Sequence, residues 1–277
     1  MTKFGKTAAL LLCLNLGLGG CSEDNKQSAN NTSSVGVKLN DTGVTACADS
    51  LSNNTICSSP TNAALPNQDA EFGRDLTLND DINGHAGFDF TKISANGAAL
   101  ASTETEWTCV EDNVTGLTWE TKTPYQTPTS ITPPTLNLRA NFYTYSWYSP
   151  SSSTNNVLFG HYNGGRCFGS SAESCDTYGY INSINKLALC GYRDWRLPSK
   201  EELRSIVDYS QRGITIDRNY FPHTSQASPP SQDFLWYWTA EHYAANLNFA
   251  WQINFNHGGD GREYKYAPKL IRLVRGN

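Results

Sequence analysis

The chain has 277 residues, with 21 basic against 26 acidic side chains and a formal net charge of −5. This acidic balance argues against nucleic acid as a partner, because attraction to phosphate needs clustered positive charge. The 8 cysteines never occur in the C-x-x-C spacing of zinc sites, so we expect neither a bound metal nor another cofactor.

Residues 1–20 have the features of a signal peptide. A basic start precedes a short apolar stretch from Ala8 to Leu18, which is too short to span a membrane because a spanning helix needs ~20 apolar residues. The following Leu18-Gly-Gly-Cys21 resembles the lipobox of bacterial lipoproteins, in which the cysteine is acylated and becomes the new N-terminus. We therefore expect an exported lipoprotein anchored through Cys21. Ser22 at the next position, in place of Asp, indicates the outer membrane.

Two further segments precede the main domain. Residues 21–46 are rich in Ser, Asn, Thr and Gly, so they are predicted to form a flexible tether. Residues 47–106 are predicted to form an extension that contains a disulfide. Within it, the loop starting at Asn79 resembles an EF-hand, but its twelfth position is Phe90 where a bidentate Glu belongs. Asp75, Asp80 and Asp81 are accordingly expected to be solvated turn residues.

Six cysteines remain after signal cleavage and acylation of Cys21. An even number in an exported chain indicates a disulfide framework, for which fifteen pairings are possible. Proximity in the sequence favours two short loops and leaves one long one, so the expected pairs are Cys47–Cys57, Cys167–Cys175 and Cys109–Cys190.

Residues 107–277 are predicted to form one α+β domain with two helices, short antiparallel strands and long loops. A hairpin is expected at 107–119, with its turn at Asp112-Asn113. The apolar spacing over 176–189 predicts a first helix, and strict alternation over 249–255 predicts a half-buried strand. Further strands are expected at 142–148 and 270–274, and loops at 123–135 and 149–156.

The stretch from Cys190 to Tyr209 predicts a strand, a turn and a capped second helix. Ser199 and Glu202 have the spacing of a capping box, and Pro198 prevents the helix from starting earlier. Leu203, Ile206 and Val207 then form one apolar face. Nothing in this stretch has the chemistry of a catalytic centre, so we interpret it as scaffold.

The same stretch carries a family resemblance. Together with Asp112–Glu120, Tyr237–Thr239 and the closing Arg272–Gly276, it resembles the Lcl C-terminal domain family, and the resemblance extends from about Gln68 to Asn277. The family is named for the end domain of a bacterial collagen-like adhesin. The resemblance implies a C-type-lectin-like fold and a role in binding. Trp119, Trp195 and Trp238 lie in these motifs and are expected to be framework residues.

Catalysis is not indicated. The sequence has no G-x-S-x-G elbow, P-loop or H-E-x-x-H motif. Formylglycine-generating enzymes share the lectin-like fold class, but they depend on reactive cysteines, and the cysteines here are expected to form disulfides. The calcium motifs of sugar-binding C-type lectins are also missing, because the corresponding strand reads Trp251-Gln-Ile-Asn254.

The loops at 242–248 and 256–266 are the candidate recognition surface. Tyr and Asn in Gly-bearing loops offer large rigid contacts and adaptable hydrogen bonds. The candidate ligand-binding residues are Tyr243, Asn246, Asn248, His257, Asp260, Arg262, Tyr264, Lys265 and Tyr266. The adhesin that names the family binds sulfated glycosaminoglycans, and a basic strip of Arg262, Lys265, Lys269, Arg272 and Arg275 could do the same. Arg272 and Arg275 also fit a structural role in the closing motif.

These observations favour a surface or periplasmic lipoprotein with a domain for ligand binding or adhesion. Its expected partners are the membrane, through the lipid, and a glycan, a glycosaminoglycan or a host or cell-surface protein. One alternative is a structural lipoprotein that faces the periplasm and has no extracellular ligand. The other is an enzyme of the formylglycine-generating type.

Overall fold

The computed structural model describes residues 40–58, 65–78, 81–124, 138–150, 159–167, 172–224 and 235–276. The expected signal peptide, Cys21 and most of the expected tether lie outside the described residues, as do most of the predicted loops at 123–135 and 149–156. Within the described ranges, no helix is long and apolar enough to cross a membrane.

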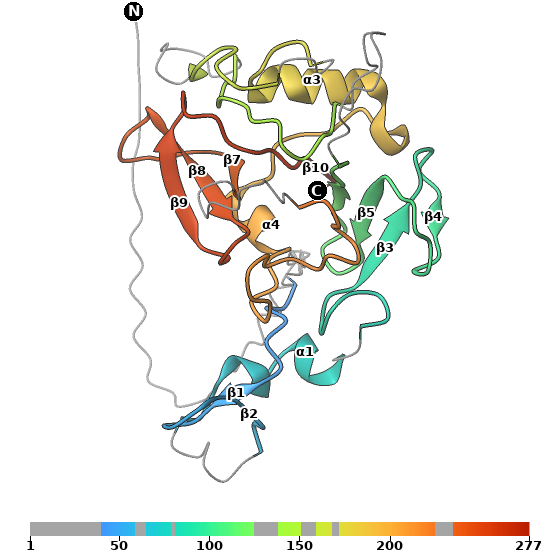
Figure 1. Ribbon diagram of the computed structural model, residues 1–277, viewed down its shortest axis with the longest axis vertical. Coiled ribbons are helices and arrows are strands. Elements are labelled where there is room, and N and C mark those ends of the chain that lie inside the picture. The colour runs from blue at the N-terminus through green and yellow to red at the C-terminus, as the bar shows by residue number, and fades with distance from the viewer. Residues whose placement is uncertain are drawn as a thin grey trace, which may run out of the picture. The chain divides into compact units, whose positions relative to one another are not determined.

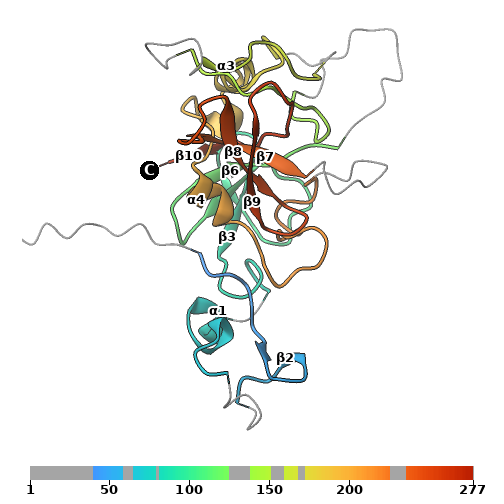
Figure 2. The same cartoon turned by 90° about the vertical axis from the view of Figure 1, so that its left-hand side faces the viewer.

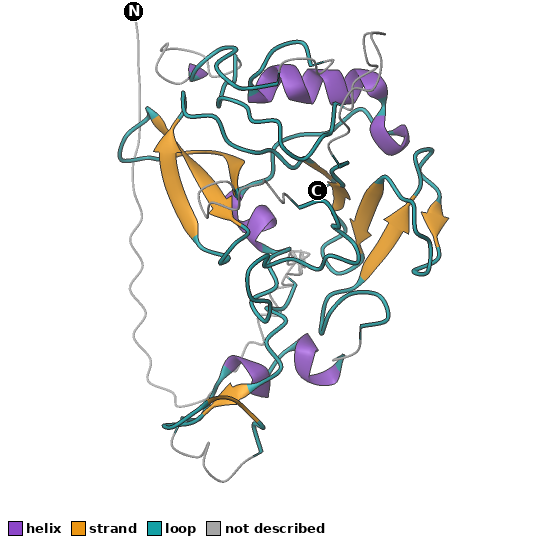
Figure 3. Cartoon of the chain, in the orientation of Figure 1, coloured by secondary structure: helices purple, strands orange, loops and turns teal. Residues whose placement is uncertain are grey.

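Two small antiparallel sheets form the framework of the domain (Figure 1). The five-stranded sheet has the order β10-β6-β5-β3-β4 and the other has the order β7-β8-β9. The strands are β3 (Phe90–Ile93), β4 (Ala99–Leu100), β5 (Cys109–Asp112), β6 (Thr118–Glu120), β7 (Trp236–His242), β8 (Phe249–Asn254), β9 (Asp260–Tyr264) and β10 (Val274–Arg275). The mixed α+β class is confirmed. Loops connect most of these short elements, as Figure 3 shows.

The predicted hairpin is confirmed as β5 and β6, and two earlier strands extend its sheet. β3 pairs with β5 over its whole length, and β4 pairs with β3. Residues 90–100, which were predicted to belong to the N-terminal extension, therefore add two strands to the five-stranded sheet. The strands are two to four residues long, so their sequence pattern is weak and only the pairing with β5 reveals them.

The two predicted helices are present, and one is shorter than expected. α3 (Thr177–Leu187) begins at Asp176, whose side chain accepts a hydrogen bond from the Gly179 amide. α4 (Lys200–Arg204) has the predicted capping box but ends after five residues, where the Ser205 hydroxyl donates to the carbonyl of Glu202. Ile206 and Val207 are still buried, although they follow the helix. Short helices are also present at α1 (Arg74–Thr77), η2 (Asp69–Glu71) and η3 (Leu189–Gly191). The strand predicted from Cys190 is wrong, because η3 covers Cys190 and Gly191 and only Arg196 forms a single bridge, to Val274.

Two predicted strands differ from the structure. Residues 142–148 form single bridges to four separate segments, at Arg166, Lys269, Asp176 and Gly160, and so make no continuous ladder. Of residues 270–274, only Val274 joins a ladder, while Leu270 forms one parallel bridge to Tyr237. In both cases the alternating pattern indicates extended, half-buried backbone but not regular pairing with one partner.

The apolar side chains form two core clusters that meet at β7. The first contains Tyr145, Tyr180, Trp195 and Trp238, and the second contains Trp119, Leu203, Tyr237 and Phe255. Successive β7 residues point to opposite faces, so Tyr237 and Trp238 enter different clusters. In the turned view of Figure 2, α3 and the pair β1 (Cys47–Ala48) and β2 (Asn53–Thr55) lie at opposite ends.

All three expected disulfides are present, at Cys47–Cys57, Cys109–Cys190 and Cys167–Cys175. Cys109–Cys190 joins β5 to η3 and closes 81 residues, whereas Cys167–Cys175 closes 8. In the chain-entropy model, loops of these lengths stabilise by roughly 4–5 and roughly 2–3 kcal/mol. The long link is therefore the main covalent constraint on the domain.

The end of the predicted tether is packed on the domain. The amide of Tyr209 donates to the Thr42 carbonyl over 2.9 Å, and the Asn40 side chain donates to Asp112. Gly43 has a φ of +77°, and a Cβ there would lie 2.5 Å from a carboxylate oxygen of Asp208. Residues 40–46 were expected to be flexible and are instead part of the folded unit, because they hydrogen-bond to it.

Candidate ligand-binding surface

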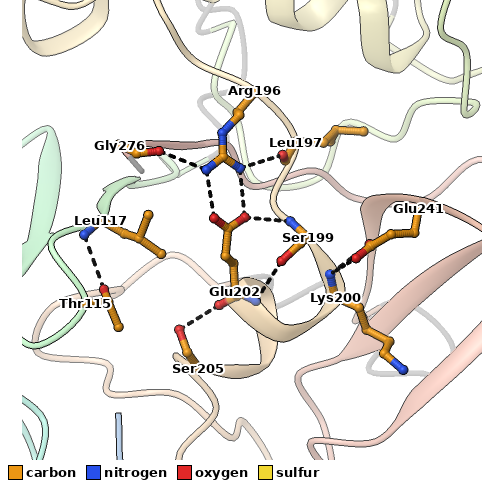
Figure 4. Close-up of polar contacts among 10 residues, drawn as sticks. All are labelled: Thr115, Leu117, Arg196, Leu197, Ser199, Lys200, Glu202, Ser205, Glu241 and Gly276. Atoms are coloured by element: carbon orange, nitrogen blue, oxygen red, sulfur yellow. Dashed lines mark hydrogen bonds and ion pairs between the residues drawn. The ribbon is translucent and has the colours of Figure 1, made fainter. Parts of the chain in front are cut away.

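An ion pair at the start of α4 holds together the framework that carries the candidate binding loops. The Arg196 guanidinium donates two hydrogen bonds of 2.7 Å to the Glu202 carboxylate and one of 2.9 Å to the Gly276 carbonyl (Figure 4). Burial opposes ionisation of Glu202, yet the bonds from Arg196 and Ser199 keep its pKa below the usual value. This pair joins the helix to the closing segment, which explains why both belong to framework motifs.

The same helix is tied to the three-stranded sheet. The Lys200 amide donates to both carboxylate oxygens of Glu241, at 2.9 and 2.8 Å (Figure 4). At the other end of α4, Arg204 forms a 2.8 Å ion pair with Asp260. The position of the sheet relative to α4 is thus fixed at β7 and at β9.

Strand β8 has an unexpected orientation. Ala250 and Gln252 are buried, whereas Phe249 and Trp251 remain partly exposed. The register pairs Phe249 with Tyr264 and Trp251 with Arg262, so these side chains share the outer face of the sheet. The predicted half-buried strand is confirmed, but its first half directs the aromatic side chains outward.

Five aromatic side chains form a continuous row on this face, which we name the aromatic strip: Tyr243, Phe249, Trp251, Tyr264 and Tyr266. Ring centroids are 5.2 Å apart for Tyr243 and Trp251, 6.4 Å for Tyr243 and Phe249, 4.0 Å for Phe249 and Tyr264, and 5.1 Å for Tyr264 and Tyr266. Tyr264 is 41% exposed and Tyr266 is 58% exposed. Contiguous exposed aromatic rings are unusual on the surface of a globular protein and mark sites of interaction.

Two cations lie against the strip. The guanidinium carbon of Arg262 is 4.8 Å from the centre of the Tyr243 ring. The ammonium of Lys200 is 4.5 Å from the centre of the Trp251 ring. Such cation–π contacts hold both the charges and the rings in place.

The predicted site residues fall at the two ends of β8. Asn246 and Asn248 are exposed in the turn between β7 and β8, next to the strip. His257 packs edge-on against Trp236 beyond the other end of β8, near Asp260. The structure therefore brings Tyr243, Asn246, Asn248, Arg262, Tyr264 and Tyr266 to one end and leaves His257 and Asp260 at the other. Sequence reasoning missed Phe249 and Trp251, because aromatic residues that alternate in a strand usually indicate core. It also missed Lys200, which was interpreted as part of the scaffold helix.

Lys265 was expected at the surface and is buried. Its ammonium lies 2.7 Å from Nδ1 of His242 and 4.5 Å from the centre of the Trp147 ring. Burial lowers the pKa of Lys265 to about 8. Burial, and then the charge of Lys265, also lower the pKa of His242, so its ring can accept this hydrogen bond. Lys265 therefore packs into the interior and is not part of the candidate binding surface.

The expected basic strip does not form. Lys265 and Arg272 are buried, Lys269 contacts Glu263 at 3.4 Å, and Arg275 is paired with Asp194 at 2.9 Å. Of the five cations, Arg262 alone is exposed. The alternative, that the closing-motif arginines are structural, is confirmed by these contacts.

A hollow of about 460 Å³ lies away from the strip, between Lys92, Trp107 and Tyr220. The Lys92 ammonium already donates to the carbonyls of Ser102 and Glu104 and lies 3.8 Å from the centre of the Trp107 ring. The buried Lys92 ammonium of this hollow is therefore already engaged by the protein itself.

A family model described as the Lcl C-terminal domain matches residues 108–275. The matched region includes every residue of the aromatic strip and both framework helices, α3 and α4. No curated protein and no solved structure matches the chain.

Proposed function

The chain belongs to the Lcl C-terminal domain family, and from this premise we propose that its domain is a ligand-binding, adhesive module whose contact surface is the aromatic strip. The α+β architecture, with two small antiparallel sheets and long loops, is compatible with the C-type-lectin-like fold that we propose for it. One observation carries the proposal. β8 exposes Phe249 and Trp251 while it buries Ala250 and Gln252. Both rings are partly exposed, so each forgoes part of the roughly 1.5–3 kcal/mol that full burial of a large apolar side chain contributes, and a bound ligand would recover that part.

We propose a glycan as the ligand. Tyrosine and tryptophan rings combine a flat apolar face with a polar edge, and they lose little conformational entropy on binding. The exposed amides of Asn246 and Asn248 and the guanidinium of Arg262 can donate hydrogen bonds to hydroxyl groups. Four of the five cations expected to hold a sulfated polymer are buried or paired, so a largely uncharged glycan fits this surface better.

Alanine at Tyr264 or Tyr266 should weaken glycan binding at least tenfold, because both rings are exposed contact residues. The free energy of unfolding should stay within about 0.5 kcal/mol of the parent value, as for most surface substitutions. The measurement is a glycan and extracellular-matrix array with the chain from Ser22 onward, followed by titration and melting of the same variants.

Tyr162→Ala is the matched control, since that tyrosine is 63% exposed and lies outside the strip. Normal binding by both strip variants would place the recognition surface elsewhere. Binding to a protein component only, or binding that weakens steeply with salt, would contradict an uncharged glycan.

We also propose that the protein is an exported lipoprotein of the outer membrane, anchored at Cys21. The three disulfides support export, because such bonds persist in oxidising compartments. They also leave none of the six described cysteines as a reactive thiol, which supports binding over a formylglycine-type reaction.

Cys21→Ser should release the protein from the membrane fraction, because the acylated side chain is lost. Cys13→Ser, which changes a cysteine inside the signal, should leave anchoring intact. Fractionation followed by blotting measures both, and full membrane partitioning of Cys21→Ser would reject the anchor. Protease access on intact cells then separates surface adhesion from a structural role facing the periplasm.

A further inference from the structure

Three aspartates from separate segments meet where the end of the tether packs against the N-terminal extension, outside the region that the family model matches. Asp41 precedes β1, Asp69 begins η2, and Asp75 lies in α1 (labelled in Figure 1). One carboxylate oxygen from each lies within 4.8 Å of those from the other two. Ionised carboxylates at this separation repel one another, so a nearby positive charge is needed to stabilise the cluster.

Asp75 is the most informative member of the cluster. It was expected to be a solvated turn residue, but its side chain is fully buried. Neither of its carboxylate oxygens accepts a hydrogen bond of good geometry, and its only backbone neighbours that favour the ionised form are the amides of Leu76 and Asp75 itself. Burial, and then the charges of Asp41 and Asp69, raise its pKa to about 6. A buried carboxylate with so little hydrogen bonding is costly, and its nearest charged neighbours increase that cost.

Cationic side chains do not supply the compensation. Among the described residues, no lysine or arginine lies within ion-pair distance of Asp41, Asp69 or Asp75. Arg74, the nearest in sequence, donates from Nε to the Gly87 carbonyl over 2.9 Å. The three carboxylates therefore form a concentrated negative site.

The backbone is shaped to hold Asp41 in this position. Gly73 has a φ of +95°, and a Cβ there would lie 2.1 Å from Oδ2 of Asp41. Gly87 has a φ of +79°, and a Cβ there would lie 2.8 Å from the Asp75 amide nitrogen. The Asp41 carboxylate accepts hydrogen bonds from the amides of Thr42, at 3.0 Å, and of Asp75, at 3.2 Å. Any side chain at either glycine would disrupt the cluster.

We propose that Asp41, Asp69 and Asp75 bind a calcium ion. Calcium takes six to eight oxygen ligands at about 2.3–2.6 Å, so oxygens on opposite sides of it lie about 4.6–5.2 Å apart. The spacing of the three carboxylates fits within that span. Magnesium is held by one or two carboxylates and keeps most of its water, so three converging aspartates favour the larger ion.

The ion would fasten the extension to the domain. Asp41 is next to Thr42, whose carbonyl accepts from the Tyr209 amide of the domain. Asp69 and Asp75 belong to η2 and α1 of the extension. A shared ion therefore links these two helices to the segment that is bonded to the domain, and this role is independent of the aromatic strip.

The test uses the chain from Ser22 onward, stripped with a chelator and titrated with calcium chloride or magnesium chloride. Calcium at about a hundred times its Kd should raise the Tm by several degrees, because the ion binds only the folded chain. Asp69→Asn and Asp75→Asn should each abolish this shift. Asp75→Asn should also raise the Tm of the calcium-free protein, since it removes a buried charge.

Asp81→Asn is the control, because it makes the same charge change at an exposed side chain and should keep the full calcium response. Asp69 is exposed, so its variant stays informative if Asp75→Asn fails to fold. The proposal is overturned if calcium leaves the parent Tm unchanged, if both aspartate variants still respond, or if magnesium acts equally well.

Discussion

Trp238→Ala should unfold the domain under conditions in which the parent is stable. Trp238 is fully buried in the first core cluster, and its indole donates to the Tyr145 carbonyl over 2.8 Å. Truncation of a buried tryptophan costs about 3–5 kcal/mol through lost contacts and the cavity left behind. It also leaves a buried carbonyl without this donor, which adds to the loss.

The same result is expected for the other two framework tryptophans. Trp195 donates from its indole to the Leu189 carbonyl at 3.1 Å, and Trp119 lies fully buried between β5 and β10. Urea unfolding of each alanine variant measures the loss. Trp251→Ala is the contrasting control, because that ring is partly exposed and should affect binding more than stability. Parent-like unfolding of Trp238→Ala would show that this core does not hold the domain together.

Local sequence signals identified the elements that depend on a few neighbouring residues. Ser199 and Glu202 predict a capping box because the two side chains satisfy amides three residues apart. The turn after Asp112 is similarly local, since its carboxylate accepts from the amide of Val114 at 3.0 Å. The disulfide pairs follow from sequence proximity, which limits the partners of four of the six cysteines.

Features that depend on distant partners could not be predicted in this way. The alternation over β8 shows that two faces differ, but it does not say which face meets the core. Trp238 and the first core cluster pack against the face of β8 that carries Ala250, so Phe249 and Trp251 lie on the outer face. Asp75 looks like a turn residue in sequence, and only the approach of Asp41, 34 residues earlier, reveals its burial. The outward face of β8 and the aspartate cluster are of this second kind, whereas the tyrosines of the neighbouring loops could be named from the sequence.

A buried charged network joins β6 to α3 and to the closing segment, and its disruption should be about as costly as loss of a core tryptophan. The Glu120 carboxylate is fully buried and accepts from Lys122 at 3.0 Å, from the Tyr180 hydroxyl and from the Leu273 amide at 3.0 Å. Arg272 donates to the Glu120 carbonyl over 2.8 Å. Removal of one partner from a buried pair costs about 3–5 kcal/mol, because the remaining charge is uncompensated.

Glu120→Gln should therefore destabilise the protein strongly near neutral pH, with a defined pH dependence. Burial lowers the pKa of Lys122 to about 8 even beside Glu120. The folded state then holds fewer protons than the unfolded state between pH 8 and the usual lysine pKa, so stability rises with pH across that window. Without Glu120 the pKa of Lys122 should fall further, so the pH range over which stability rises should begin at a lower pH. Urea unfolding at pH 6, 7 and 9 should show the deficit of Glu120→Gln shrinking as pH rises.

Two further variants separate the charge pair from general damage to β6. Glu111→Gln removes an exposed carboxylate from the neighbouring strand and should change stability by about 0.5 kcal/mol or less. Glu120→Gln combined with Lys122→Met should recover much of the loss, because replacing both members of a buried pair leaves no uncompensated charge. The contrary result is a loss of stability in Glu120→Gln that is independent of pH and persists in the double variant. That result would mean that the packing of the Glu120 side chain, and not its charge, stabilises the fold.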